Sequence, residues 1–141
     1  MKHLRWAVLP ILLLFCACGG DDEDPGLIEF ETIAIGDQSP ISPGRSEFVI
    51  NDDPEYEQLF GTTANVDFDR ETVIAVFLGP VGNSGNSFEI TEVVDNFSNI
   101  TVRITWRVPR VPAGATTNHY HVIKTQKLAR PVVFSTLEVR E

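Results

Sequence analysis

From residue 27 to the end of the chain, apolar side chains mostly recur at every second position, which is the period of a β-strand. The clearest stretch covers residues 100–108, where Ile100, Val102, Ile104 and Trp106 share one face and polar residues lie between them. Successive strand residues point to opposite faces, so this stretch predicts a strand with one face in the core. No helical period is long enough for a helix bundle. The alternation therefore predicts a mainly β domain.

A coarse division of the chain gives seven strands and one short helix. The expected strands cover residues 27–33, 47–50, 72–78, 87–94, 100–108, 119–124 and 132–139. Residues 72–78 form a continuous apolar, β-branched run, which is typical of a central strand covered on both faces. The strands at 87–94 and 100–108 are expected to form an antiparallel hairpin. We expect a single domain over residues 27–141, either an antiparallel β-sandwich or an open barrel-like domain.

Residues 53–61 carry the signals of the one expected helix. Asp53 can cap the free N–H groups of the first turn, and Pro54 suits that turn because it has no N–H to leave unpaired. Gly61 can close the helix at its C-terminus. The apolar residues of this segment fall at spacings of three and four, so they predict a helix that lies with one face on a sheet.

The first 17 residues have the layout of a secretory signal peptide. Lys2 and Arg5 precede an apolar stretch at residues 6–15, which is too short to cross a bilayer as a helix. Residues 15–18 (Phe-Cys-Ala-Cys) resemble the lipobox of bacterial lipoproteins, in which the last cysteine becomes the lipidated first residue of the mature protein. We expect Cys18 to carry the lipid; an ordinary signal peptide with two incidental cysteines is the alternative.

Residues 18–26 continue from the lipidated cysteine into an acidic, flexible tether. This implies a protein anchored in the bacterial cell envelope, most simply at the outer membrane. Acidic residues directly after such a cysteine resemble a surface-export signal of some bacteria, so display on the cell surface is an open alternative. The other alternative is a solvated linker that carries no export signal.

Charge and cysteine content restrict the partners. Lys2 and Arg5 leave with the signal, so nine basic residues remain against 20 acidic ones and the formal charge becomes −11. A surface of this sign repels nucleic acid, so no nucleic-acid partner is expected. Cys16 also leaves and Cys18 carries the lipid, so the folded domain has no thiol for a disulfide, a metal site or a nucleophile.

Two groups of residues carry side chains that can bind a metal ion. His119 and His121 lie two apart on an expected strand, so both rings point to one face, but no third ligand lies near them in sequence. Four acidic residues could gather around Ca²⁺ but lack the spacing of a calcium loop; they are Asp52, Asp53, Asp67 and Asp69. No Gly-x-Ser-x-Gly elbow marks an activated serine. We expect no metal, no cofactor and no catalytic residues.

The order of segments between about residues 41 and 134 resembles the PrcB C-terminal domain family, found in accessory lipoproteins of bacterial surface protease complexes. The resemblance rests on the residues 73–79 (Val-Ile-Ala-Val-Phe-Leu-Gly) and on a Thr, aromatic and His segment at residues 116–124. The family loop usually carries Gly-Gly-Tyr, where this chain has Gly85-Asn86-Ser87. The resemblance implies a non-enzymatic, envelope-anchored domain that binds or stabilises a protein partner, with a protease as the candidate.

A second resemblance is to chagasin-type inhibitors of cysteine proteases, β-sandwiches that block an active-site cleft with three loops. The corresponding loops here cover residues 83–87, 111–117 and 130–131, and the inhibitor hypothesis requires them to cluster at one end of the sandwich. Loops tolerate functional change more easily than strands. The candidate partner-binding residues are Asn83, Ser84, Gly85, Asn86, Gly114, Arg130 and Pro131.

Overall fold

The computed structural model describes residues 26–41, 44–82, 85–111 and 114–141. The signal peptide, Cys18, the tether up to Pro25, and the loop residues Asn83 and Ser84 lie outside these ranges. The strands are β1 (Phe30–Gly36), β2 (Ser46–Ile50), β3 (Glu71–Phe77), β4 (Ser87–Asp95), β5 (Ile100–Val108), β6 (Tyr120–Gln126) and β7 (Val132–Arg140), and the helix is α1 (Asp53–Phe60).

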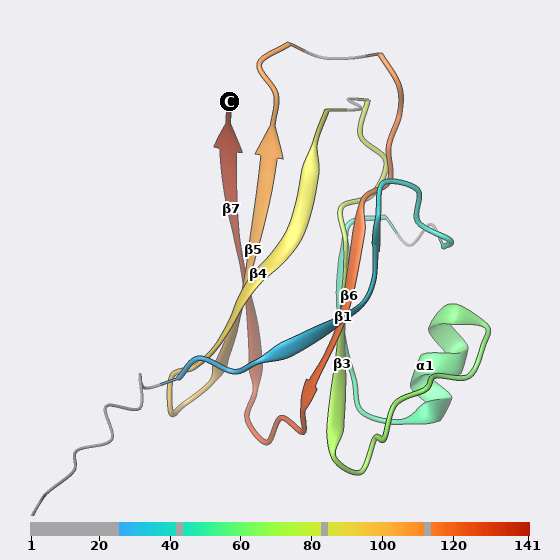
Figure 1. The fold of residues 1–141 in the computed structure, drawn as a ribbon, viewed down its shortest axis with the longest axis vertical. Coiled ribbons are helices and arrows are strands. Elements are labelled where there is room, and N and C mark those ends of the chain that lie inside the picture. The colour runs from blue at the N-terminus through green and yellow to red at the C-terminus, as the bar shows by residue number, and fades with distance from the viewer. Residues whose placement is uncertain (1–25, 42–43, 83–84, 112–113) are drawn as a thin grey trace, which may run out of the picture.

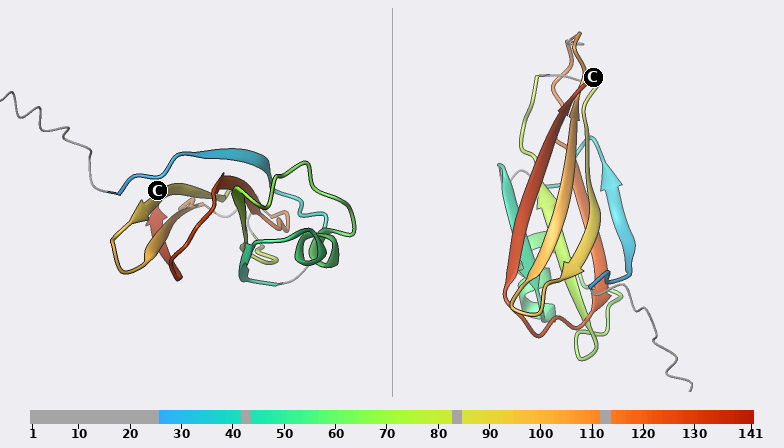
Figure 2. Two further views of the ribbon diagram at one scale, coloured as in Figure 1. Left: turned by 90° about the horizontal axis from the view of Figure 1, so that it is seen from below. Right: turned by 90° about the vertical axis from the view of Figure 1, so that its left-hand side faces the viewer.

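The strands form two sheets, and the fold class is confirmed as mainly β with one short helix and no closed barrel. One sheet has the order β1-β6-β3-β2 and the other β4-β5-β7. Figure 1 shows the two sheets as separate layers, with α1 on the face of the four-stranded sheet that points away from the three-stranded sheet. The view from below in Figure 2 shows the same three layers in cross-section.

One strand pair departs from the antiparallel arrangement expected from sequence. β7 runs parallel to β5, from Ile100↔Val132 to Val108↔Arg140. The reason is the path of the chain: after β5 it crosses to the other sheet, runs back along β6, and crosses again before β7. Each crossing reverses its direction, so β7 enters its sheet pointing the same way as β5. Parallel neighbours require such crossovers, which strand periodicity does not reveal.

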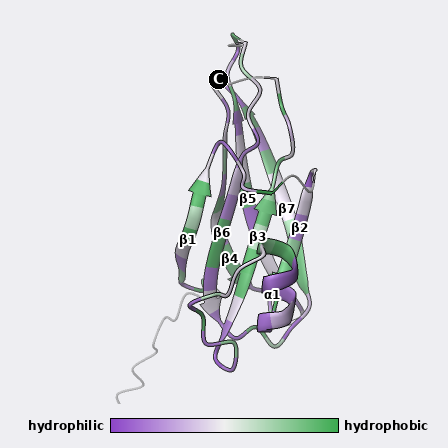
Figure 3. Ribbon diagram, turned by 90° about the vertical axis from the view of Figure 1, so that its right-hand side faces the viewer, coloured by the Kyte–Doolittle hydropathy of each residue, from purple (hydrophilic) through white to green (hydrophobic). Residues whose placement is uncertain are grey.

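The strand β3 is buried on both of its faces, as its apolar run predicts. Ile74 and Val76 pack between the two sheets, in a cluster with residues of β4, β5 and β6. Val73 and Phe77 pack on the opposite face, against α1 and its neighbouring loops. Figure 3 shows β3 coloured as a largely hydrophobic strand. Burial of each such side chain contributes about 1.5–3 kcal/mol, so β3 is the centre of the core.

Backbone N–H groups join the two sheets along one side. The backbone N–H of Ile28 donates to the carbonyl of Val93 at 2.8 Å. The N–H of Ile90 on β4 donates to Nδ1 of His121 on β6 at 2.9 Å. The expected first strand at residues 27–33 is therefore shifted: β1 begins at Phe30, and Ile28 before it bonds to the other sheet. At the opposite side of the sandwich, β2 and β7 are the end strands of their sheets.

The helix α1 lies where its sequence signals place it, but the expected N-cap is wrong by one residue. The cap is Asp52, whose Oδ1 accepts a hydrogen bond from the N–H of Glu55 at 2.8 Å. Asp53 is the first helical residue. Gly61 ends the helix with φ of 70° and donates its N–H to the carbonyl of Glu57, as expected. A Ser, Thr, Asp or Asn is equally suited to either cap position, so sequence alone could not separate Asp52 from Asp53.

The cap gives the first prediction. Replacing Asp52 with Ala leaves the Glu55 N–H without its partner, so Asp52→Ala is expected to lower the free energy of unfolding by about 1 kcal/mol. Asp53→Ala removes the same charge one residue later and keeps the cap, so its effect should be less than half as large. Urea denaturation followed by circular dichroism measures both; equal losses would contradict the assignment of Asp52 as the cap.

Candidate functional site

Two of the three loops predicted to bind a partner share one end of the sandwich. Ser87, the first residue of β4, lies opposite Arg107 near the end of β5. The segments before and after these strands are joined to each other, because Val81 and Thr117 exchange two backbone hydrogen bonds of 2.8 Å. We call the described residues 85–87, 109–111 and 114–117 the loop end; it lies at the top of Figure 1.

The third predicted loop lies at the opposite end, so the expected cluster of three loops is wrong. The carbonyl of Pro131 accepts a hydrogen bond from the N–H of Ile100, at the start of β5. Arg130 pairs with Asp95, the last residue of β4. The parallel pairing of β5 and β7 causes this separation, because the residues before β7 must lie beside the beginning of β5. Arg130 and Pro131 therefore do not belong to the loop end.

Asn86 supports the loop end from inside. Its side chain is buried, and its Oδ1 accepts a hydrogen bond from the indole N–H of Trp106 at 3.3 Å. The guanidinium of Arg45 lies over the same indole, 5.9 Å from its centroid. Asn86 thus fixes the start of β4 against β5. Its role is structural, although the sequence predicts it as a residue that contacts a partner.

Most of the exposed residues of the loop end come from the β5–β6 connection. Val111 is 80 % exposed, and a Cβ at Gly114 would meet no atom within 4 Å, so Gly114 faces open space. The base of this connection is fixed, because the N–H of Arg110 donates to the carbonyl of Glu141 at 2.6 Å. A large apolar side chain is thereby presented on an anchored segment, where a partner can reach it.

A small cavity of about 200 Å³ beside the loop end was missed by the sequence reasoning. It is lined by Ile35, Gly36, Asp37, Asn86, Ser87, Phe88, Glu89 and His119. His119 is 93 % buried, and its Nε2 has no hydrogen-bond partner in the described part of the chain. Burial lowers the pKa of His119, and the carboxylate of Asp37 partly opposes this shift. No local sequence signal links residues 37, 87 and 119, because strands far apart in the chain bring them together.

The two histidines considered as metal ligands both face β4, as their spacing predicts, but their environments differ. Nδ1 of His121 accepts the N–H of Ile90, which places the proton on Nε2, and Nε2 lies 2.9 Å from the hydroxyl of Thr32. Both ring nitrogens of His121 are therefore used in joining three strands. Burial lowers the pKa of this imidazole because it disfavours the charged form.

The acidic residues considered as calcium ligands serve local structure. Asp52 caps α1, and Oδ1 of Asp67 accepts the N–H of Asp69 at 3.2 Å. Arg70 pairs with Asp67 at 3.8 Å. Within the described ranges, no three His, Cys, Asp or Glu residues gather as a metal-binding group.

The buried position of His121 predicts a pH-dependent stability. Its pKa is lowered from 6.5 in the folded state, so the unfolded chain binds more protons as the pH falls. The stability from neutral His121 is complete above about pH 7 and is lost as the pH falls through 6.5 toward the lowered value. We expect urea denaturation to give a smaller free energy of unfolding at pH 5.5 than at pH 7.5.

The variant His121→Asn tests which group is responsible. It removes the titrating group and part of the buried hydrogen bonding, so it should lower the free energy of unfolding at pH 7.5 by about 1–3 kcal/mol. It should also reduce the difference between the free energies of unfolding at pH 5.5 and pH 7.5. His119→Asn is the matched variant, since the pKa of His119 is also lowered. A His121→Asn protein that kept the full pH difference would contradict the assignment.

Comparison with known proteins gives no further information on the site. A scan against protein-family models, a search of curated proteins and a search of solved structures each found no match for this chain. In the described residues, no helix is both long and apolar enough to cross a membrane. The resemblances to the PrcB C-terminal domain and to chagasin-type inhibitors therefore stay predictions from sequence.

Proposed function

We propose that this chain is a lipid-anchored, non-enzymatic binding domain of the bacterial cell envelope, and that it binds a protein partner through its loop end. The lipid is carried by Cys18 and the acidic residues after it act as a tether. An envelope protease is the partner to test first, because the sequence resembles accessory lipoproteins of protease complexes.

The observation that carries this proposal is the direction of the domain relative to its tether. The chain enters the domain at Gly26, whose carbonyl accepts the N–H of Asp95 at the end of β4. The loop end lies at the start of the same nine-residue strand. At about 3.3 Å per residue, the two ends are roughly 30 Å apart. A lipid before Gly26 would therefore attach the domain by the end opposite to the loop end, which leaves the loop end accessible to a partner.

The chemistry of the loop end favours a protein partner. Val111 supplies an exposed apolar contact, and the cavity that adjoins the loop end at Asn86 and Ser87 is bordered by the acidic residues Asp37 and Glu89. The arrangement suits an interface with an apolar contact and a basic side chain of the partner near the cavity. The chagasin-type alternative needs Arg130 and Pro131 at the loop end, but these two residues lie at the opposite end of the sandwich.

The loop end can be tested by affinity capture. The lipidated protein is used to capture partners from the native envelope, and the captured proteins are identified by mass spectrometry. Val111→Asp places a charge in the proposed interface and is expected to reduce capture of a stoichiometric partner about tenfold. Phe97→Asp is the matched control, because Phe97 is 76 % exposed and lies in the β4–β5 turn at the opposite end. Equal capture by both variants would overturn the loop end as the interface.

The anchor gives a separate prediction. Cys18→Ser removes the lipid acceptor, so the protein should move from the membrane pellet to the soluble fraction after ultracentrifugation. Cys16→Ser changes the neighbouring cysteine and should leave the protein in the pellet with a lipid on Cys18, detectable as a mass increase. A Cys18→Ser protein that still sediments with membranes would contradict lipid anchoring.

A further inference from the structure

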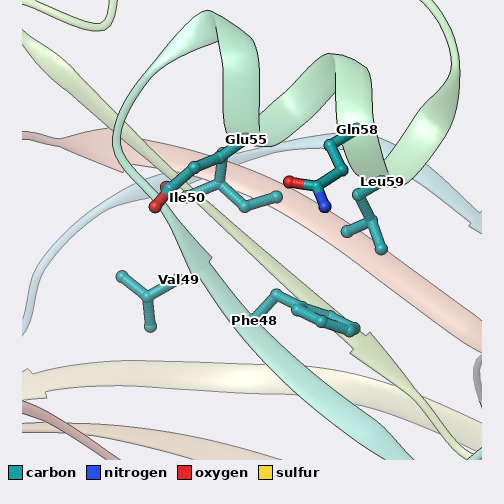
Figure 4. Close-up of a pocket in the computed structure, with 6 residues that line it drawn as sticks. All are labelled: Phe48, Val49, Ile50, Glu55, Gln58 and Leu59. Carbon is teal, nitrogen blue, oxygen red and sulfur yellow. The ribbon is translucent and has the colours of Figure 1, made fainter.

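A groove beside β2 offers a second binding surface, distinct from the loop end. Its volume is about 380 Å³, and it is lined by Phe48, Val49 and Ile50 of β2 and by Glu55, Gln58 and Leu59 of α1. Figure 4 shows Gln58 and Leu59 reaching from the helix toward the strand that carries Phe48. The three lining residues of β2 are consecutive, and consecutive strand side chains point to opposite faces. The groove therefore follows the edge of β2.

That edge of β2 is open for strand pairing. β2 is the last strand of its sheet and pairs with β3 on one side, and in the described part of the chain no strand pairs with the other. Sheets usually protect such an edge with a proline, a lysine or a bulge. The segment Ser46–Ile50 (Ser-Glu-Phe-Val-Ile) has no proline or lysine, its one charged residue is Glu47, and its register with β3 has no bulge. The N–H and C=O groups on this edge can pair with an added strand.

The floor of the groove is apolar and held in place. The ring of Phe48 packs edge-on against Phe77 in the core, with 5.9 Å between centroids. Ile50 is buried, and Leu59 is partly buried against the same cluster. An apolar side chain that entered beside Phe48 and Leu59 would meet a formed surface, so binding there would need little rearrangement.

The rim of the groove is acidic. The helix and its cap carry four carboxylates and no basic residue; these are Asp52, Asp53, Glu55 and Glu57. Glu55 lines the groove itself, and its Oε2 accepts the N–H of Asn51 at 3.1 Å, which fixes the carboxylate at the end of β2. The nearby Lys127 is held by the carbonyls of Asn51 and Phe68. Charge complementarity therefore selects a basic occupant.

We propose that this groove binds an extended, basic segment of a partner protein, which adds as a strand to the edge of β2. Main-chain hydrogen bonds to β2 would supply affinity, and an apolar side chain beside Phe48 and Leu59 would supply specificity. A lysine or arginine two residues away points to the same face and reaches Glu55. With the loop end, the domain would then have two separate protein-binding surfaces.

A designed peptide tests the proposal on the full lipidated chain in detergent. The probe is fluorescein-labelled Ser-Thr-Lys-Thr-Leu-Thr-Lys-Thr-Ser, which places a lysine two residues from the leucine in either strand direction. Its binding is followed by fluorescence anisotropy. We expect saturable binding that weakens as salt is raised from about 0.05 to 0.5 M, since exposed charges are screened. A peptide with glutamates for lysines should not bind.

Two matched changes locate the site. Glu55→Gln keeps an acceptor for the Asn51 N–H and removes the charge, so it should weaken binding about threefold. Glu57→Gln makes the same change on the same helix outside the groove lining, and should leave binding unchanged. A peptide N-methylated at every second residue, made in both registers, should fail to bind in at least one register because strand pairing needs its N–H groups.

Three outcomes would overturn the proposal: no binding of the probe at millimolar concentration, equal effects of Glu55→Gln and Glu57→Gln, or undiminished binding of both N-methylated peptides. Light scattering tests whether a second copy occupies the groove instead; a dimer that Gln58→Arg dissociates would also overturn it. The same Gln58→Arg chain, used in the envelope capture, separates this inference from the proposed function. A partner lost with Val111→Asp and kept with Gln58→Arg belongs to the loop end alone.

Discussion

The fold depends on the burial of β3 on both of its faces. Ile74 and Val76 fill the space between the two sheets, while Val73 and Phe77 hold α1 against the outside of the four-stranded sheet. A single seven-residue strand thus belongs to two hydrophobic clusters, and each cluster determines where another layer can lie. Thr72, also buried on β3, has hydrogen-bond partners in Asn51 and Leu128. A polar residue without such partners at one of the four apolar positions would cost much of the stability of a small domain.

The second constraint is that backbone N–H groups join the sheets along one side. His121 and Ile28 connect the four-stranded sheet to β4, so that side is closed by hydrogen bonds. On the other side β2 and β7 end their sheets, and Arg45 reaches across from the start of β2 to the hydroxyl of Thr136 on β7 at 3.3 Å. The sandwich is therefore closed by backbone hydrogen bonds on one side, and the side chain of Arg45 bridges the other. The groove at β2 lies away from these bonds, whereas the cavity beside the loop end is lined by Glu89, the neighbour of Ile90.

Features that depend on neighbouring residues could be predicted from the sequence, whereas features that depend on the tertiary arrangement could not. The strands at residues 72–78 and 100–108 and the helix at residues 53–60 were predictable because periodicity and capping act over a few neighbouring residues. The Asp52 cap was missed by one position because Asp52 and Asp53 have the same side chain. The cavity at His119 was not predictable, since it needs elements that are far apart along the chain. The groove at β2 is lined by neighbouring segments of the chain, but strand periodicity does not show that β2 is the end strand of its sheet.

The sequence by itself determined the mainly β class, the single short helix, the double burial of β3 and the expectation of a lipid on Cys18. Each of these depends on the identity and spacing of neighbouring residues. Only the tertiary structure decided which loops meet. Residues 85–87 and 114–117 came together, whereas Arg130 went to the opposite end, because β7 pairs parallel to β5. Strand direction is set by how the chain crosses between sheets, and a local pattern of apolar residues is the same in either direction.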